Sequence, residues 1–161
     1  MIIYICAYAC RGIVMKVVIQ VCKQASVKVD GIMHNQINNG YVLLVGIDKN
    51  DNEEIIKKMA EKIYHLRINK DENDKTNLSI TQVNGEILSI SQFTLCAILD
   101  SRRPSFTFAA PAAIAKDLYE KFNAHLASYG LIVKDGVFGA DMEVSLINDG
   151  PFTIVVTEKD L

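Results

Sequence analysis

Tyr41-Val-Leu-Leu-Val45 is an unbroken apolar run of strand length in the first third of the chain. Such a run, without alternating polar residues, predicts a central strand that is buried on both faces of a sheet. Two segments before it, residues 16–21 and 26–29, also have strand character, and the second alternates apolar with polar side chains. Asp30-Gly31 follows them and is typical of a two-residue hairpin turn. The first part of the chain is therefore expected to form neighbouring strands.

Two helices are predicted farther along the chain from apolar residues spaced four apart. The first runs from about Asn52 to Leu66, with Asp51 and Glu54 as a capping pair at its start. Its apolar face carries Ile55, Met59 and Ile63. The second helix has Pro111 near its first turn and Gly130 at its end. Its apolar face carries Ile114, Leu118, Phe122 and Leu126.

Further strand-like runs lie at residues 86–90, 142–147 and 152–156. Strands at both ends of the chain with two helices between them predict the α+β class, with a curved, mainly antiparallel sheet covered by the helices. A chain of 161 residues without repeats, low-complexity tracts or Pro/Gly/Ser-rich linkers fits one domain of this kind.

The composition narrows the class of protein. Charged residues make up 22% of the chain and the net charge is −2, which argues against a protein that binds nucleic acid through bulk charge. A local basic patch stays compatible with these values. The cysteines form no CxxC pair and no disulfide framework, which predicts a reducing compartment, the cytoplasm. They are Cys6, Cys10, Cys22 and Cys96.

Several common chemistries lack a sequence signal. His34, His65 and His125 are scattered, so we expect no metal site. The chain has no P-loop and no GxGxxG segment, so no nucleotide cofactor is expected. A G-x-S-x-G elbow is also absent, although the members of a Ser-His-Asp triad meet only in space and need no such elbow.

Two polar clusters follow strand-like runs, where a rigid scaffold would fix their backbone. They are Ser91-Gln-Phe-Thr-Leu95 and Asn148-Asp-Gly-Pro-Phe-Thr153. From the residues alone, the first also fits an ordinary strand end with Phe93 in the core. The second equally fits a turn before a last strand. With Gly136-Val-Phe-Gly-Ala-Asp-Met142 between them, the two clusters in this order carry a more specific pattern.

This pattern resembles the D-aminoacyl-tRNA deacylase (D-tyrosyl-tRNA deacylase) family, from Met15 to about Thr157. The resemblance implies a cofactor-free enzyme that hydrolyses the ester of D-aminoacyl-tRNA to tRNA and D-amino acid. It also implies a barrel-like sheet in a symmetric homodimer whose active site is shared between subunits. Residues 15–161 would form the deacylase-like domain.

Residues 1–14 would then be an N-terminal extension outside the chemistry. The segment is apolar with one charge, Arg11, and is shorter than the ~17–25 residues of a membrane-spanning helix. It also lacks the basic start and small-residue cleavage site of a secretory signal, and a mitochondrial leader usually has more Arg and Ser.

The resemblance assigns the main-chain N–H groups of Phe93 and Thr94 to the oxyanion of the hydrolysed ester, with Ser91 and Gln92 orienting the substrate or supporting that backbone. Backbone donors at a rigid strand end stabilise such an oxyanion without reorganisation. Thr94 as a nucleophile is the alternative, but no base lies near it in sequence. The attacking group is water or the terminal ribose hydroxyl of the tRNA.

The resemblance also implies a cis peptide at Gly150-Pro151 that reaches into the active site of the partner subunit. Its backbone would reject an L side chain sterically and admit a D side chain. The same geometry would admit glycyl-tRNA, including glycine mischarged on tRNA-Ala.

Other residues are assigned to substrate binding by resemblance. Phe138, Gly139 and Met142 would line the pocket for the terminal adenosine, although Phe and Met are more often core residues. Arg102 and Arg103 would hold acceptor-stem phosphates, although adjacent arginines are most often a solvated surface. Thr153, the last residue of the second cluster, is also assigned to the substrate.

Two positions depart from the family pattern. Val21 stands where an Arg is usual, and Phe152 stands where a Val is usual. Both changes favour a related animal deacylase with a trans Gly-Pro peptide that removes L-alanine from mischarged tRNA. Ser91 and Phe93 follow the D-specific pattern instead, which favours the D-specific enzyme. A non-catalytic nucleic-acid-binding module on the same fold is the further alternative, because residues 98–101 carry fewer basic residues than is usual in that loop.

Overall fold

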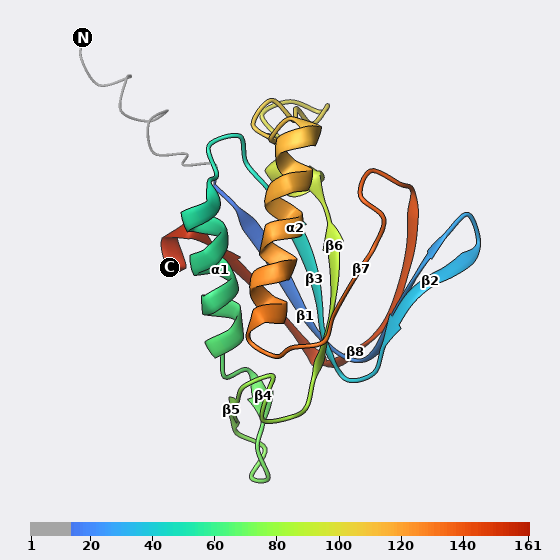
Figure 1. Ribbon diagram of the computed structural model, residues 1–161, viewed down its shortest axis with the longest axis vertical. Helices are drawn as coiled ribbons and strands as arrows, with labels where there is room; N and C mark the ends of the chain where they lie inside the picture. Colours follow the sequence, from blue (N-terminus) through green and yellow to red (C-terminus); the bar gives the residue numbers. More distant parts are fainter. Residues whose placement is uncertain (1–13) are drawn as a thin grey trace.

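The structure is a computed structural model that describes residues 14–161 (Figure 1). The predicted extension 1–14 lies outside the described residues except for Val14, as do Cys6 and Cys10. No helix within the described part of the chain is long and apolar enough to cross a membrane.

A curved six-stranded sheet forms the centre of the molecule, and two helices lie side by side over one of its faces (Figure 1). The strand order is β2-β1-β3-β6-β7, and β8 pairs with β1. The strands are β1 (Lys16–Val29), β2 (Ile32–Ile37), β3 (Gly40–Gly46), β6 (Glu86–Ser91), β7 (Val133–Asp135) and β8 (Met142–Thr157). The helices are α1 (Glu53–His65) and α2 (Ala112–Ser128). A small hairpin joins β4 (Asn69–Lys70) and β5 (Thr76–Leu78), and short 3-10 turns span Phe93–Cys96 and Glu158–Asp160.

The central strand is β3, as its unbroken apolar run predicts. Tyr41 and Leu43 are fully buried in the core beneath the helices, and Val42 is fully buried in a second core on the opposite face. The second core also contains Leu88 and lies where the sheet curls toward β8. Apolar layers thus cover β3 on both faces. The curved sheet with two helices over one face confirms the predicted α+β single domain with a barrel-like sheet and two covering helices.

The pairings of the main sheet are mixed. β1 pairs antiparallel with β2, β3 and β8, and Asp30-Gly31 forms the predicted hairpin turn with positive φ angles. β6 pairs parallel with both β3 and β7. The parallel pairs arise because α1 lies in the connection from β3 to β6, and α2 lies in the connection from β6 to β7.

Two pairs of predicted strands are each a single long strand. Residues 16–21 and 26–29 both belong to β1, and residues 142–147 and 152–156 both belong to β8. The two strands pair along their whole length, with register shifts between Gln20 and Cys22 and between Cys22 and Gln24. A bulge of this kind interrupts the alternation of buried residues while the ladder continues, so the sequence pattern suggested two strands.

The helix boundaries are close to those predicted, but two residues have other roles. Asn52, rather than Asp51, caps α1, because its side chain accepts a hydrogen bond from the N–H of Ile55. Asp51 instead accepts from the backbone N–H groups of Met15 and Asp48. In α2, Ile114 is 52% exposed, and Ala115 and Tyr119 lie on the buried face with Leu118, Phe122 and Leu126.

Candidate active site

A cavity of about 500 Å³ opens at the carboxyl end of β6. Its lining comes mainly from the end of β6, from the segment that leads into α2 together with the first turn of that helix, and from the connection from β7 to β8 with the start of β8, and Ile47 just after β3 joins them. Among the predicted site residues, the cavity brings together Ser91, Gln92, Phe93, Phe138, Gly139 and Met142.

The end of β6 is fixed by the neighbouring central strand. The N–H of Gln92 donates to the carbonyl oxygen of Val45 at 2.7 Å, and the chain then enters the 3-10 turn Phe93–Cys96. A Cβ atom on Gly46 would lie 2.7 Å from Cβ of Leu95. The turn can therefore pack this closely on β3 only because residue 46 is glycine.

The turn leaves two backbone donors without an acceptor. Phe93 and Thr94 are its first residues, so their N–H groups have no partner inside the turn. Neither group donates a hydrogen bond to any other part of residues 14–161. Both residues are exposed, and Phe93 is 55% exposed, so the alternative with Phe93 in the core is wrong. Two adjacent N–H groups at a rigid strand end match the arrangement that stabilises an oxyanion.

Among the described residues that line the cavity, no hydroxyl side chain has a hydrogen bond to a base. The side-chain Nε2 of Gln92 donates to Oγ1 of Thr94 at 2.5 Å. Asp141 is the single titratable residue that lines the cavity in the described part of the chain, and no His, Lys or Cys joins it. Hydroxyl nucleophiles need an adjacent base, so the geometry favours attack by a molecule from solution over attack by Thr94.

A hydrogen-bonded carbonyl in β6 holds α2 and the connection from β7 to β8 against this strand. The carbonyl oxygen of Ser89 accepts from the hydroxyl of Tyr119 at 2.7 Å and from the N–H of Gly136 at 3.1 Å. The ring of Tyr119 lies 6.0 Å from that of Phe138, centroid to centroid. Burial raises the pKa of Tyr119 above its ordinary value. The hydroxyl therefore stays protonated and donates this bond at neutral pH.

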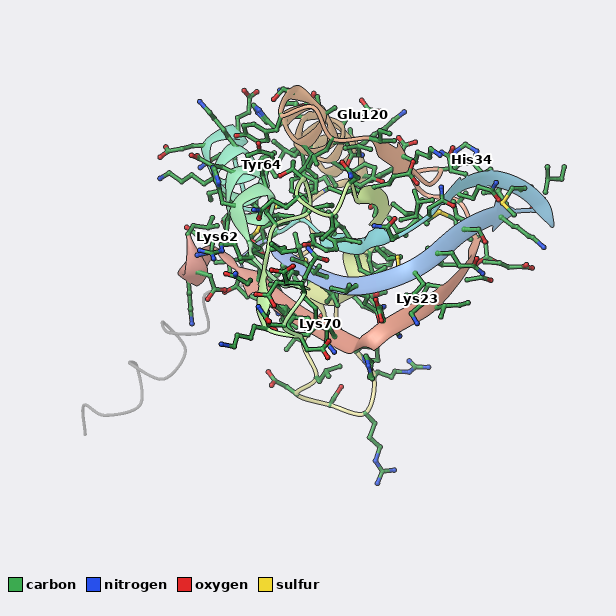
Figure 2. The ribbon with its side chains drawn as sticks, turned by 90° about the horizontal axis from the view of Figure 1, so that it is seen from below. Lys23, His34, Lys62, Tyr64, Lys70 and Glu120 are labelled. Carbon is green, nitrogen blue, oxygen red and sulfur yellow. The ribbon has the colours of Figure 1, made fainter. Side chains whose placement is uncertain are left out.

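The second polar cluster, residues 148–153, lies away from the cavity at β6 within the same chain. The Gly150-Pro151 peptide is cis, both residues are exposed, and neither lines the cavity at β6. Gly150 instead borders a smaller cavity of about 190 Å³ together with Val21 and Phe152. Nearby, Lys23, labelled in Figure 2, has its Nζ 4.0 Å from Oδ1 of Asp149. Thr153 is exposed on β8 opposite Gln20 of β1. One chain alone therefore does not bring Gly150, Pro151 and Thr153 to the cavity.

Arg102 and Arg103 are exposed on the segment between the 3-10 turn and α2. This segment, yellow in the colour scale, projects from the body of the molecule (Figure 2). Two hydrogen bonds between Ile98 and Ser105, at 2.8 and 3.0 Å, close it into a hairpin-like loop. The loop returns to the cavity at Ala109 and Ala110, where the N–H of Ala110 donates to the carbonyl oxygen of Ile47 at 3.0 Å.

The family assignment follows from comparison with known proteins. A sequence profile of the family described as "D-Tyr-tRNA(Tyr) deacylase" matches residues 18–157. The chain belongs to this family. The D-aminoacyl-tRNA deacylase of Staphylococcus epidermidis is 52% identical over 147 residues, which cover 91% of this chain and 97% of that protein. The D-aminoacyl-tRNA deacylase of Thermosipho africanus is 50% identical over 146 residues, or 90% and 98% of the two chains.

Solved structures of similar proteins have the same fold. The structure of a protein named "c-Myc DNA Unwinding Element Binding Protein" superposes with a TM-score of 0.83 at 38% identity and covers 88% of this chain and 97% of its own. A second structure, of a probable eukaryotic D-amino acid tRNA deacylase, has a TM-score of 0.78 at 15% identity, with 88% and 98% coverage, and supports the fold alone.

Sequence reasoning missed several residues around the cavity. Asp141 belongs to the quoted 136–142 motif, so its position in that motif was an available signal. Tyr119 and Phe106 carried no such signal. Tyr119 stands next to Leu118 on a helix face that the four-residue spacing did not select, and Phe106 follows a loop that was considered for its arginines alone.

Proposed function

We propose that this protein hydrolyses the ester bond of D-aminoacyl-tRNA and releases free tRNA and the D-amino acid. The observation that carries the proposal is the pair of adjacent N–H donors of Phe93, which lines the cavity, and Thr94, which follows it; neither has an acceptor within the described chain. Identity of about 50% to curated D-aminoacyl-tRNA deacylases over most of the chain supports the same activity.

In the proposed reaction, water attacks the ester carbonyl carbon, and the carbonyl oxygen takes up negative charge opposite Phe93 and Thr94. The bond from carbon to the ribose oxygen then breaks, and that oxygen leaves with a proton. A ribose hydroxyl that attacked the carbon would only move the ester to the neighbouring oxygen, so water has to complete hydrolysis. Loss of one oxyanion donor typically lowers the rate by about 10²–10³.

The substrate-binding roles follow from the lining of the cavity. Phe138 and Met142 provide apolar surface in the same cavity as Ser91 and Gln92, and a nucleobase packs favourably on such surface. We assign this part of the cavity to the terminal adenosine. Arg102 and Arg103 are assigned to phosphates of the tRNA, where exposed guanidinium groups bind without displacing a structural partner.

We assign the rejection of L-aminoacyl groups to the backbone of Gly150 and Pro151 in a homodimer. Both residues are exposed, and they lie away from the cavity of their own chain. This location supports a role in the cavity of a partner subunit, with Thr153 beside them. A backbone screen of this kind admits glycine as well, so glycyl-tRNA mischarged on tRNA-Ala is a proposed second substrate. Residues 15–161 would carry out this function, and the cytoplasmic location stays a prediction.

The experiment that tests the proposal compares deacylation of D-tyrosyl-tRNA and L-tyrosyl-tRNA, with glycyl-tRNA and L-alanyl-tRNA alongside. We expect rapid loss of the D-tyrosyl and glycyl esters and survival of the L-tyrosyl ester. Cleavage of L-alanyl-tRNA at a comparable rate would favour the L-alanine-removing relative suggested by Val21 and Phe152. Survival of every ester would contradict the proposed activity.

A second candidate function is non-catalytic nucleic-acid binding. It is favoured by the similar protein at 38% identity, whose name describes binding to a DNA unwinding element. The two functions separate in the same experiment, because a binding module would retain each aminoacyl-tRNA without cleaving it.

A further inference from the structure

Two aromatic rings stand exposed beside the cavity: Phe93 lines it, and Phe106 contacts Phe93. Phe93 is 55% exposed and Phe106 is 36% exposed, and their rings meet edge to face with centroids 5.1 Å apart at an interplanar angle of 68°. Phenylalanine is among the residues most often buried. A pair of exposed rings beside a cavity therefore indicates a surface that contacts a ligand.

The position of Phe106 is fixed by the loop that carries it. The hydrogen bonds between Ile98 and Ser105 close the loop on one side of the ring. On the other side, the carbonyl oxygen of Phe106 accepts from the N–H of Ala109 at 3.0 Å, and the carbonyl oxygen of Phe108 accepts from the N–H of Lys49 at 2.9 Å. The two rings thus form a preformed surface, which lowers the ordering cost of binding.

The charge of the loop fits an anionic partner. Arg102 and Arg103 precede Phe106 by a few residues and are exposed, while Asp100 is the one acidic residue between Ile98 and Phe106. Exposed aromatic rings interleaved with arginines are typical of surfaces for single-stranded nucleic acid, where bases stack on rings and cations hold the backbone. A purely apolar partner, such as a lipid or an aliphatic peptide, would gain nothing from the arginines.

We propose that Phe93 and Phe106 form a stacking platform for the unpaired nucleotide that precedes the terminal adenosine of the tRNA. The proposal rests on the proposed function and names a subsite for the same substrate. Phe93 links the two subsites, because it lines the cavity and also forms half of the ring pair. A base on the rings would therefore be continuous with an adenosine in the cavity, and Arg102 and Arg103 would lie toward the phosphates that follow.

The test compares two esters. D-Tyrosyl-tRNA contains this nucleotide together with the rest of the tRNA, whereas D-tyrosyl-adenosine contains the terminal nucleoside alone. For Phe106→Ala we expect the KM for D-tyrosyl-tRNA to rise on the order of tenfold to a hundredfold, and the increase for D-tyrosyl-adenosine to be at least about tenfold smaller. Phe106→Trp restores a large stacking face, so its KM for the tRNA should return toward the wild-type value.

The matched control is Leu99→Ala, which removes an apolar side chain that is 75% exposed from the same loop without removing a ring. Its KM values should stay close to wild type for both esters. An equal KM increase for both esters in Phe106→Ala would overturn the platform, since the variant would then have disturbed the turn itself. An unchanged KM for the tRNA, or a change of oligomeric state in size-exclusion chromatography with light scattering, would also overturn it.

A binding measurement keeps this proposal separate from the proposed activity. If the wild-type protein cleaves neither ester, the activity has failed, and the affinity for the uncharged trinucleotide CCA decides about the platform. Weaker binding of CCA to Phe106→Ala, with the weak binding of adenosine less affected, would support the platform. Equal binding of CCA to both proteins would exclude it.

Discussion

The side-chain Nε2 of Gln92 lies 2.5 Å from Oγ1 of Thr94 and donates a hydrogen bond to it across the turn that ends β6. The bond joins the last residue before the turn to the second residue within it. It therefore spans Phe93 and holds the two proposed oxyanion donors in one orientation. This arrangement gives Gln92 and Thr94 a shared role in positioning the backbone.

A double-mutant cycle tests the shared role of Gln92 and Thr94. We expect Gln92→Ala and Thr94→Val each to lower kcat for D-tyrosyl-tRNA about fivefold, since a lost side-chain hydrogen bond typically costs ~1 kcal/mol. The double variant should be no slower than either single variant, because both remove the same bond. If the reductions of kcat in the two single variants multiply in the double variant, Gln92 and Thr94 have independent roles. Loss of all measurable activity in Thr94→Val alone would instead identify Thr94 as the nucleophile.

The contribution of the backbone donor at Phe93 is testable by comparing proline with alanine at this position. Proline lacks the N–H group and is tolerated at the first residue of a helical turn. Gln92 before it has φ −140° and ψ 77°, which lies outside the helical region that a following proline disfavours. Phe93→Pro and Phe93→Ala both lack the ring, so they differ mainly in the donor. We expect kcat for the proline variant to be lower by about 10²–10³. Equal kcat values would remove Phe93 from the oxyanion site.

Gly150→Ala tests the backbone screen. Gly150 has φ +125°, which L side chains rarely adopt, and a Cβ atom would lie 3.0 Å from the backbone nitrogen of Phe152. We expect a lower unfolding free energy and a large fall in the rate for D-tyrosyl-tRNA, because the added methyl group occupies the screen. Gly130→Ala is the control, since Gly130 has φ +86° with nothing within 4 Å of its Cβ position. It should lose comparable stability in urea denaturation but keep its activity. If both variants lose activity alike, Gly150 has no special role.

The sequence predicted those parts of the fold that local patterns determine. The unbroken apolar run of β3 can be satisfied only by burial on both faces, so its central position followed. The four-residue spacing predicted α2 but misplaced Ile114, because each step of four residues rotates by about 40° against a helix of 3.6 residues per turn. The same drift hid Tyr119. Contacts between distant residues, such as Tyr119 with Ser89, leave no local pattern at all.

In the candidate site, too, the sequence indicated individual residues but not the contacts between distant segments. Ser91 to Thr94 and Phe138 to Met142 were selected by their resemblance to a family, and their meeting in one cavity depends on the parallel pairing of β6 with β7. No local pattern encodes that pairing, because the strands belong to segments separated by a helix. The ring pair of Phe93 and Phe106 was missed because an apolar residue in a loop is usually assigned to the core by default.

The two departures from the family pattern border one cavity, which predicts that they depend on each other. Val21 is 9% exposed and shares this cavity with Phe152. Val21→Arg alone should lower the unfolding free energy strongly, since it places a large charged side chain without a partner at a position that is only 9% exposed. Val21→Arg with Phe152→Val should lose less than the sum of the single variants, with a coupling of about 0.5–3 kcal/mol in urea denaturation. Additive losses would show that the two positions are independent.

Asp51 gives the fold a pH dependence whose sign follows from its burial. Burial raises the pKa of Asp51 from 3.8 to about 6, which outweighs the opposite effect of the N–H donors of Asp48 and Met15. The pKa of Asp51 is higher in the folded chain than in the unfolded chain, so folding favours the protonated carboxyl group. The contribution of Asp51 to the unfolding free energy is therefore fully present below pH 3.8 and is lost as the pH rises through 6. Asp51→Asn cannot titrate, so the difference in unfolding free energy between wild type and this variant should fall as the pH rises from about 4 to 7.

Urea denaturation at several pH values measures this difference, and Asp71→Asn provides the control. Backbone hydrogen bonds from Lys75 and Asn73 lower the pKa of Asp71, so this carboxylate is ionised in both the folded and the unfolded chain above about pH 5. The difference between wild type and Asp71→Asn should therefore stay constant from about pH 5 to 7, where the difference for Asp51→Asn still falls. A constant difference for Asp51→Asn as well would show that Asp51 ionises as freely in the folded chain as in the unfolded one. A difference that rises with pH would mean that the N–H groups of Met15 and Asp48 stabilise the carboxylate more than burial disfavours it.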